Sequence, residues 1–357
     1  MPPHMRPDQP TDRTRPLRTI ADLVAAGLVA PIEADALEAV GQRYAVAITP
    51  AMVELIEAGN PDDPIARQFV PNARELIETP GERADPIGDR VHEKVPGLIH
   101  RYPDRVLLKL THACPVYCRF CFRREMVGPG GDTMLGGALD RAIAYIAAHW
   151  SVREVILTGG DPLMLSPRRI ADVTARLAAI PRVDILRWHS RVPIVDPTLV
   201  DDALVAALGA DGKAVYVGIH ANHPRELTDA ARAAIGRLRG GGLHLISQTV
   251  LLKGINDDAA TLEALFRAFV GLGIRPYYLH HADLAPGTAH FRTTIAEGQA
   301  LMRALRGRIS GLALPTYILD IPGGFGKVPV GPDYVEADGG VFDNDGQRHA
   351  NPTGDRD

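Results

Sequence analysis

The sequence predicts an α/β fold with an N-terminal helical region, and two observations support this prediction. From residue 105 onward, short runs rich in β-branched residues alternate with segments of helical periodicity. Such alternation over six units is typical of a parallel sheet whose strands are joined by right-handed crossovers. Periodicity alone does not distinguish a sheet that partly closes into a barrel from an open, doubly wound sheet.

The expected strands are short and apolar. They span residues 105–111, 154–158, 184–190, 214–220, 243–252 and 274–281, and a further strand-like run, 313–320, leads into a glycine-rich loop. The helices between them are indicated by apolar residues at helical spacing, namely Leu139, Ile143, Ala147 and Trp150, then Ile170, Val173, Leu177 and Ile180, and then Leu262, Phe266 and Phe269.

The segments outside this alternation set the expected domain boundaries. Residues 1–18 are rich in Pro, Arg and Asp without the apolar core of a secretory signal, and we expect a disordered tail. "TIADLVAAG" and "TPAMVELIEAG" each end in glycine, a common helix stop, so residues 19–80 are expected to be helical. Polar residues 81–103 resemble a linker. The predicted units are a helical region with its linker at 19–98, a core at 99–325, and an extension at 326–357 that is frayed after about residue 343.

The composition excludes several classes of protein. Hydrophobic residues at 46% and charged residues at 23% are ordinary for a globular protein, and a net charge of −4 gives no reason to expect nucleic acid. No run reaches the roughly 18–20 apolar residues that are needed to span a bilayer. We therefore expect a cytoplasmic enzyme that binds neither nucleic acid nor membrane.

Polar residues gather where the predicted strands end. In parallel α/β folds, the chemistry lies at the C-terminal ends of the strands. The residues that follow or end successive strands are Cys114–Cys121, Gly159–Asp161, His189–Arg191, His220–His223, Gln248 and Asp283. Their shared position predicts one site at one end of the sheet.

The three cysteines of the chain, Cys114, Cys118 and Cys121, lie within eight positions. An odd number of closely spaced thiols argues against disulfides and favours a metal. A zinc site with His112 as the fourth ligand is one possibility. A [4Fe–4S] cluster held by three thiolates, with one iron left open, is a second, and a coincidental grouping of the thiols is the third. The spacing favours the cluster, because His112 would have to reach the metal from an extended strand.

The C-x3-C-x2-C loop after the first strand resembles that of the radical S-adenosylmethionine (SAM) enzymes. The motifs "NPDDPIARQFVP", "CRFCFRR", "LTGGDPLM", "HSRVPIV", "HANHP", "SQTVLLKGIND", "RPYYLHHADLAPGTAHFRT" and "PGGFGKVPV" are similar, in order and spacing, to those of the lysine 2,3-aminomutase family. This resemblance covers roughly residues 45–335. It implies a partial (βα)6 TIM-like barrel of the radical SAM type.

The resemblance implies that Cys114, Cys118 and Cys121 hold a [4Fe–4S] cluster whose open iron binds S-adenosyl-L-methionine. Arg119 and Arg123 are expected to favour the charged thiolates. Gly159, Gly160 and Asp161 match the family's SAM-binding motif, with the carboxylate available to the methionyl ammonium, although a strand-end turn alone would also explain them. Further SAM-binding candidates at neighbouring strand ends are Ser190, His220 and Gln248.

Lys327 lies in "DIPGGFGKVP", which is not a Walker loop, because Ile321 and Val328 stand where Gly and Ser or Thr are needed. A lysine on a mobile glycine-rich loop suits a Schiff base with pyridoxal 5′-phosphate. The resemblance implies this role for Lys327, which would otherwise be taken for a surface lysine. The resemblance also matches Arg101, Tyr102 and Arg105 to the family's phosphate-binding stretch.

The resemblance further implies how the substrate is held. Arg123 matches the residue that binds the α-carboxylate of lysine, and Asp283 and Asp320 match the two carboxylates that bind the ε-ammonium. A pair of acids selects a diamine over a neutral or acidic amino acid. The implied reaction is the interconversion of L-lysine and β-lysine by 1,2-amino migration.

Four alternatives stay open. A related branch makes β-lysine for modification of elongation factor P, and another cationic amino acid could be the substrate. A radical enzyme that has lost pyridoxal would act on a different substrate, and a zinc-binding α/β module would not be an enzyme. An electron donor such as flavodoxin or ferredoxin is an expected partner. A homo-oligomer is possible, but the extra cysteines that bind zinc between subunits of known aminomutases are missing from this chain.

Overall fold

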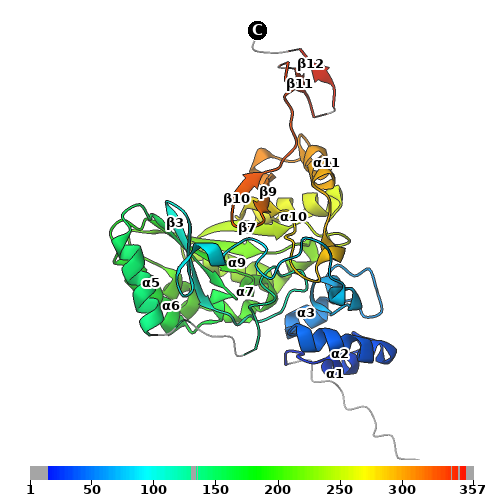
Figure 1. The fold of residues 1–357 in the computed structure, drawn as a ribbon, viewed down its shortest axis with the longest axis horizontal. Coiled ribbons are helices and arrows are strands. Elements are labelled where there is room, and N and C mark those ends of the chain that lie inside the picture. Colours follow the sequence, from blue (N-terminus) through cyan, green and yellow to red (C-terminus); the bar gives the residue numbers. More distant parts are fainter. Residues whose placement is uncertain (1–14, 130–133, 135, 339, 345, 351–357) are drawn as a thin grey trace, which may run out of the picture.

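The computed structural model describes residues 15–129, 134, 136–338, 340–344 and 346–350, and its centre is one ten-stranded sheet (Figure 1). The strands follow one another in sequence order from β1 to β10. They are β1 Glu93–Val95, β2 Leu98–Tyr102, β3 Arg105–Thr111, β4 Glu154–Gly159, β5 Ile185–Ser190, β6 Ala214–His220, β7 His244–Val250, β8 Arg275–His280, β9 Thr316–Ile321 and β10 Gly326–Pro329.

The strands β3 to β9 are parallel, and the pairs β1–β2, β2–β3 and β9–β10 are antiparallel. Among the described residues, no ladder joins β1 to β10, so the sheet does not close. This confirms the partial barrel. It also adds β9 as a seventh parallel strand to the six that the sequence predicts as the core.

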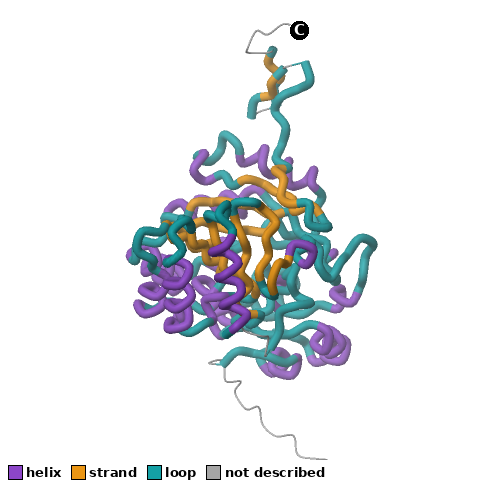
Figure 2. The backbone as a smooth tube through the Cα atoms, turned by 60° about the vertical axis from the view of Figure 1, so that its left-hand side comes forward, coloured by secondary structure: helices purple, strands orange, loops and turns teal. Residues whose placement is uncertain are grey.

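A helix lies between each pair of consecutive parallel strands, and Figure 2 shows these helices outside the curved sheet. They are α5 Gly137–Ala148, α6 Pro167–Ala178, α8 Asp202–Leu208, α9 Asp229–Gly240, α10 Ala259–Gly271 and α11 Ile295–Leu305, with the short α7 Val192–Val195 before α8. Helices α6, α8, α9, α10 and α11 begin after a Ser, Thr or Asp whose side chain accepts a hydrogen bond from the first turn. Two of the expected apolar positions are exposed: Ala147 in the last turn of α5, and Trp150, which lies beyond α5 and is 82% exposed.

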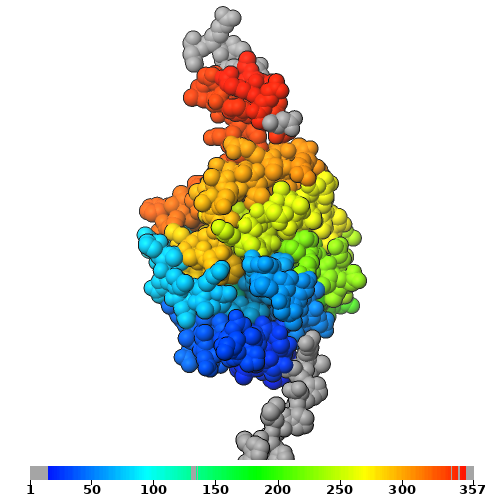
Figure 3. Space-filling model, turned by 90° about the vertical axis from the view of Figure 1, so that its right-hand side faces the viewer, coloured from blue at the N-terminus to red at the C-terminus, as the bar shows by residue number. Residues whose placement is uncertain are grey.

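The N-terminal region, dark blue in Figure 3, lies at the opposite end of the molecule from the C-terminal hairpin. It contains shorter helices than expected. Its helices are α1 Ile20–Ala25, α2 Ala34–Arg43, α3 Pro50–Leu55 and α4 Ala66–Phe69. The expected disordered tail, 1–18, is too long, because Leu17 is buried and pairs with Ile48 in a β-bridge. Residues 1–14 of that tail lie outside the described residues.

The expected linker at 81–103 is wrong, because β1 and β2 form there. The Pro96-Gly97 turn, with Gly97 at φ 82°, reverses the chain between them, and β2 pairs with β3. The boundary at 326 is wrong as well, since β10 belongs to the main sheet. The expected frayed tail contains a small hairpin, β11 Val341–Phe342 and β12 Arg348–His349, which projects from the body (Figures 1 and 2).

Short 3-10 turns complete the fold, and some of them cover the C-terminal ends of the strands. They span Pro31–Glu33, Ala73–Leu76, Arg90–His92, Pro162–Met164, Pro197–Leu199, Pro224–Glu226, Ala289–Phe291 and Gly311–Ala313. No helix in the described part of the chain is both long and apolar enough to cross a membrane.

The alternation of side chains along each strand positions the site. On β5, the fully buried Leu186 and Trp188 belong to the hydrophobic core, whereas His189 between Trp188 and Ser190 lines the pocket. The same alternation on β6 buries Val217 and Ile219 in the core and leaves His220 in the pocket. The inner surface of the sheet is therefore polar at its C-terminal end.

Candidate active site

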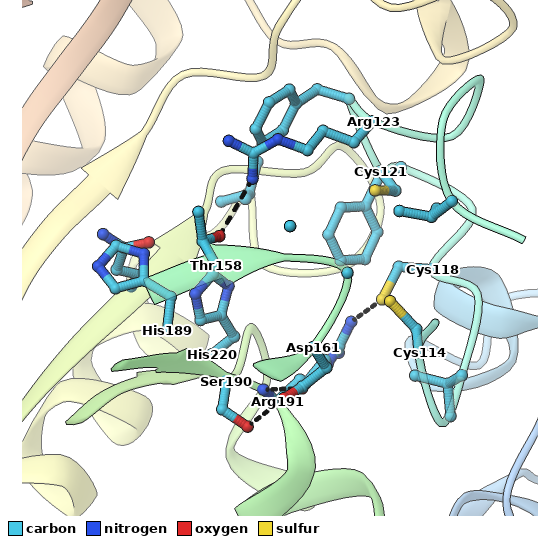
Figure 4. Close-up of a pocket in the computed structure, with 18 of the residues that line it drawn as sticks. Cys114, Cys118, Cys121, Arg123, Thr158, Asp161, His189, Ser190, Arg191 and His220 are labelled. Atoms are coloured by element: carbon cyan, nitrogen blue, oxygen red, sulfur yellow. Dashed lines mark hydrogen bonds between the residues drawn. The ribbon is translucent and has the colours of Figure 1, made fainter. Parts of the chain in front are cut away.

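A pocket opens at the C-terminal ends of β3 to β8, where the sequence predicts the site (Figure 4). Eleven predicted site residues line it together: Cys114, Cys118, Cys121, Arg123, Gly159, Gly160, Asp161, Ser190, His220, Gln248 and Asp283. The other five, Arg101, Tyr102, Arg105, Asp320 and Lys327, lie on the neighbouring β2–β3 and β9–β10 pairs.

The three cysteines lie on one side of the pocket, across from His189 and His220 (Figure 4). Burial raises the pKa of the Cys114 thiol well above its usual range and that of Cys121 to about 11. Thiolates at this place therefore need nearby positive charge. Arg191 supplies one contact, because its Nη1 donates to the Cys118 sulfur at 2.8 Å.

The expectation that Arg119 supports the thiolates is wrong, whereas the one for Arg123 holds in part. Arg119 is 1% exposed and donates to the Glu75 carboxylate and to the Ala45 carbonyl oxygen. Arg124 donates to the same carboxylate. These contacts anchor the cysteine loop to the N-terminal region. Arg123 does act on a thiol, since its charge opposes the rise in the pKa of Cys121.

Gly159 and Gly160 bring β4 against the segment that leads into the cysteine loop. Gly160 N–H donates to the Thr111 carbonyl oxygen at 2.5 Å, and Asp161 N–H donates to that of Ala113 at 2.9 Å. A Cβ on either glycine would collide with these backbone oxygens, and Gly159 has φ 120°. Both glycines line the pocket and also fix the start of the cysteine loop.

The Asp161 carboxylate is turned toward the chain after β5. Its Oδ1 accepts hydrogen bonds from Ser190 Oγ at 2.7 Å and Leu163 N–H at 3.1 Å. Its Oδ2 accepts from the N–H groups of Arg191 at 2.7 Å and Val192 at 3.1 Å. Ser190 and Asp161 therefore fix the turn that carries Arg191.

Three histidines from β5, β6 and β8 line the opposite wall. Burial lowers the pKa of His220 to about 3, and it lowers the pKa values of His189 and His280 well below the usual range. All three are neutral near pH 7. Within the described residues, the Nε2 atom of each is buried without a hydrogen-bond partner. His280 did not figure among the predicted site residues, although it ends a strand like the others.

Arg123 extends toward the β3–β4 side of the pocket. Its Nη1 donates to Thr158 Oγ1 at 3.3 Å, and its Nη2 donates to Asp89 Oδ2 at 3.3 Å (Figure 4 shows the Thr158 contact). Asp89 also contacts Lys109 and Arg101. Sequence reasoning missed Asp89, which lies in the expected linker. It also missed Lys109, although a single lysine within the apolar run "RVLLKLT" was a usable signal.

The two acids predicted to bind an ammonium group influence each other. Asp283 lines the pocket, and burial, with the negative charge of Asp320 next in importance, raises its pKa to about 7. Asp320 is 6% exposed and accepts a hydrogen bond from Arg101 Nη1 at 2.9 Å. The two carboxylates thus belong to one electrostatic cluster.

Lys327 lies in β10 rather than on a loop, which corrects the expectation of a mobile segment. It faces Asp320 across the β9–β10 pair, and its Nζ donates to Asp320 Oδ2. Its backbone N–H donates to the Tyr102 hydroxyl at 2.8 Å. The Arg105 guanidinium stacks on the Tyr102 ring with 3.8 Å between its Cζ and the ring centroid. Lys327, Tyr102 and Arg105 are therefore neighbours.

Two family models match this chain: the radical SAM superfamily over residues 108–265 and lysine-2,3-aminomutase over residues 302–340. The L-lysine 2,3-aminomutases of Clostridium subterminale and Fusobacterium nucleatum are each 41% identical over 290 residues. These matches cover 81% of this chain and 70% and 68% of the relatives. The chain belongs to the lysine 2,3-aminomutase family of radical SAM enzymes. A glutamate 2,3-aminomutase of Clostridioides difficile is also similar, at 34% identity over 86% of this chain and 72% of that protein.

Membership of the lysine 2,3-aminomutase family implies a [4Fe–4S] cluster and SAM, and the pocket fits both. Three thiols from one loop line it, and a guanidinium N–H reaches a thiol sulfur. Unpartnered histidine nitrogens on the opposite wall can form hydrogen bonds with a polar ligand. Among the described residues, no group of three His, Cys, Asp or Glu side chains is arranged around a single metal ion.

Proposed function

We propose that this protein is a pyridoxal phosphate-dependent aminomutase that interconverts L-lysine and β-lysine by 1,2-amino migration. One observation carries the proposal. Lys327, the candidate cofactor lysine, contacts Asp320, and burial together with the charge of Asp320 raises the pKa of the pocket-lining Asp283. An amine and a pair of acids therefore lie in or beside the pocket of the three cysteines.

Cys114, Cys118 and Cys121 would hold the [4Fe–4S] cluster. Together with SAM, the cluster would supply the one-electron chemistry that removes a hydrogen atom from the substrate. Arg191 supports the charge on Cys118, and the anchored loop keeps the thiols in place. The apolar residues Val116, Phe120, Val127 and Val250 also line the pocket, where they would limit the access of water. The electron would come from a flavodoxin or a ferredoxin.

Pyridoxal phosphate would be held at Lys327, where it would supply a carbonyl carbon that carries the migrating nitrogen. The surroundings of Lys327 support this assignment. Arg105 is partly exposed, pairs with the exposed Asp104 and presents its guanidinium next to Tyr102, which makes it the candidate for the phosphate. Arg101 is the less available cation, because it is buried between Asp320 and Asp89.

The substrate would be held at both ends. Arg123 would bind the α-carboxylate, and Asp283 and Asp320 would bind the ε-ammonium. The Lys327 ammonium contacts Asp320 in this structure. The ε-ammonium of the substrate would have to take the place of the Lys327 ammonium on this carboxylate. The acid pair favours lysine over glutamate, which lacks that ammonium.

An oxygen-free assay tests the proposal. Reconstituted protein receives dithionite, pyridoxal phosphate and SAM, and is offered L-lysine, ornithine, arginine and glutamate side by side. We expect β-lysine from lysine as the main product. The assignment of substrate would be contradicted if the protein forms 5′-deoxyadenosine but moves the amino group of glutamate alone. It would also be contradicted if the amino group of none of the four amino acids moves.

The Lys327→Ala variant tests the cofactor lysine separately. It should lose lysine isomerisation and the absorbance of protein-bound pyridoxal phosphate, while reductive cleavage of SAM stays measurable. Wild-type conversion of lysine by this variant would show that Lys327 has another role.

A further inference from the structure

The carboxylate of Asp89 joins three cations of the candidate active site. Its Oδ2 lies 3.2 Å from Lys109 Nζ and 3.3 Å from Arg123 Nη2, and its Oδ1 lies 3.4 Å from Arg101 Nη2. The Asp89 side chain is 3% exposed. Burial raises its pKa, but the charges of Arg123 and Lys109 outweigh this effect and bring the pKa to about 2. Asp89 is therefore a buried anion at neutral pH.

These contacts continue to the candidate cofactor lysine. Arg101 bridges the two carboxylates, with Nη2 toward Asp89 and Nη1 donating to Asp320 Oδ1 at 2.9 Å. Asp320 in turn accepts from Lys327. An unbroken series of ion pairs thus connects Arg123, the candidate for the substrate carboxylate, with Lys327.

The charges in this series are not balanced. Even without Lys327, Arg101, Lys109 and Arg123 are three cationic groups, whereas Asp89 and Asp320 are the two carboxylates in direct contact with them. An excess of positive charge in a poorly solvated site favours an anionic ligand.

Arg123 has a donor left for such a ligand. Thr158 and Asp89 occupy its Nη1 and Nη2. Its Nε is buried and has no hydrogen-bond partner among the described residues. A buried donor without a partner is costly unless a ligand satisfies it. Arg123 also lines the pocket, so a ligand bound there would lie beside this side chain.

We propose that Asp89 is a positioning residue that holds Arg123 for the α-carboxylate of the amino acid substrate. This inference rests on the proposed function, in which Arg123 binds that carboxylate. Lys109 and Arg123 share one oxygen of Asp89, and two cations so close together in a buried space repel each other without it. Loss of the Asp89 charge would therefore move Arg123 away from its place between Thr158 and Asp89.

The test compares two ligands that differ only in the α-carboxylate, the group that Arg123 is proposed to bind. Equilibrium binding of L-lysine and of cadaverine, which is lysine without its carboxylate, is measured on the reconstituted wild type and on Asp89→Asn. We expect lysine to bind roughly 10- to 100-fold more weakly to the variant, and cadaverine to bind as to the wild type.

Glu154→Gln is the matched control. Glu154 is the first residue of β4, at the opposite end of the strand from the pocket, and contacts Arg187 Nε at 2.8 Å. Like Asp89→Asn, the Glu154→Gln substitution removes a carboxylate that pairs with an arginine inside the barrel. We expect both ligands to bind this variant as they bind the wild type.

Asp89→Glu is a second variant in case Asp89→Asn does not fold. It keeps the charge but displaces it, and should weaken lysine alone by a smaller factor.

An equal loss for lysine and cadaverine would overturn the proposal, because Asp89 would then support the whole site rather than the carboxylate end. Unchanged or tighter lysine binding in both Asp89 variants would overturn it as well. Absence of lysine binding in the wild type would instead overturn the proposed function.

Discussion

Lys327 and Asp320 face each other across the antiparallel pair β9–β10, and the lysine ammonium donates to the aspartate carboxylate. The strand register itself therefore places an amine on the carboxylate that is proposed to bind the ammonium of the substrate. Asp320 is buried and also accepts a hydrogen bond from Arg101. In our proposal, the Asp320 carboxylate contacts the cofactor lysine, Arg101 and the ε-ammonium of the substrate.

Asp320→Asn should weaken the binding of lysine by roughly 10- to 100-fold, because the ε-ammonium loses one of its two carboxylates. Norleucine, which lacks the ε-amine, should bind the variant and the wild type equally. Binding titrations of both ligands on both proteins check this. If norleucine loses as much affinity as lysine, Asp320 acts by holding Lys327 and Arg101 rather than by contacting the substrate.

Lysine binding should depend on pH through Asp283. Burial and then the charge of Asp320 raise its pKa to about 7, so it is mostly protonated below pH 7 and ionised above it. The substrate ammonium binds the ionised form. Lysine affinity should therefore fall by up to about tenfold per pH unit below pH 7 and level off above pH 8.

Binding measurements between pH 6 and pH 8.5 test this dependence. Asp283→Asn should bind lysine weakly and without the step near pH 7. A step of the same size in that variant would assign the titration to another group.

The sequence predicted the parallel strands well and the edge strands poorly, for a physical reason. Buried parallel strands are continuous apolar runs, and each of those predicted lies within a few residues of its true position. By contrast, β1, β2 and β10 are short, and their conformation depends on pairing with neighbours that the local sequence does not reveal. The Pro96-Gly97 turn was the available signal for β1 and β2.

The position of the pocket was predictable because it follows from the topology of the sheet. The series of ion pairs from Arg123 through Asp89 to Lys327 was not predictable. Residues at successive strand ends meet at one edge of a parallel sheet, which placed the cysteines, Asp161, His220 and Asp283 together. Asp89 reaches Arg123 only through the packing of its loop on β2 and β3. Sequence proximity also misled: Arg119 is next to Cys118 in the chain, yet its side chain contacts Glu75.

Replacing Arg191 should make the cluster harder to reduce. A charged donor to a ligand sulfur stabilises the more negative, reduced cluster, so its loss should lower the midpoint potential by on the order of 50 mV. Arg191→Gln alone would leave Glu226, which is 0% exposed, without its cation, at a cost of about 3–5 kcal/mol in folding stability.

The double variant Arg191→Gln/Glu226→Gln removes that unpaired charge and should recover most of the stability while keeping the lower potential. A reductive titration followed by electron paramagnetic resonance measures the potential, and thermal unfolding measures the stability. An unchanged potential in a folded, iron-loaded double variant would show that the Arg191 contact does not tune the cluster.

Gly160→Ala should impair loading of the cluster rather than the fold as a whole. The added Cβ would collide with the Ala113 carbonyl group, which is backbone and cannot turn aside, and would push the segment that leads to Cys114 out of place. We expect the iron content to fall well below the roughly four atoms per chain of a loaded cluster. Iron and sulfide analysis after anaerobic reconstitution measures this content.

Gly236→Ala is the matched control, because a Cβ at that position in α9 meets open space. It should load iron as the wild type does and gain about 0.5–1 kcal/mol in stability from its higher helix propensity. Full iron loading in Gly160→Ala would mean that the cysteine loop tolerates displacement. The close contact between β4 and the loop would then not be what sets the position of the thiols.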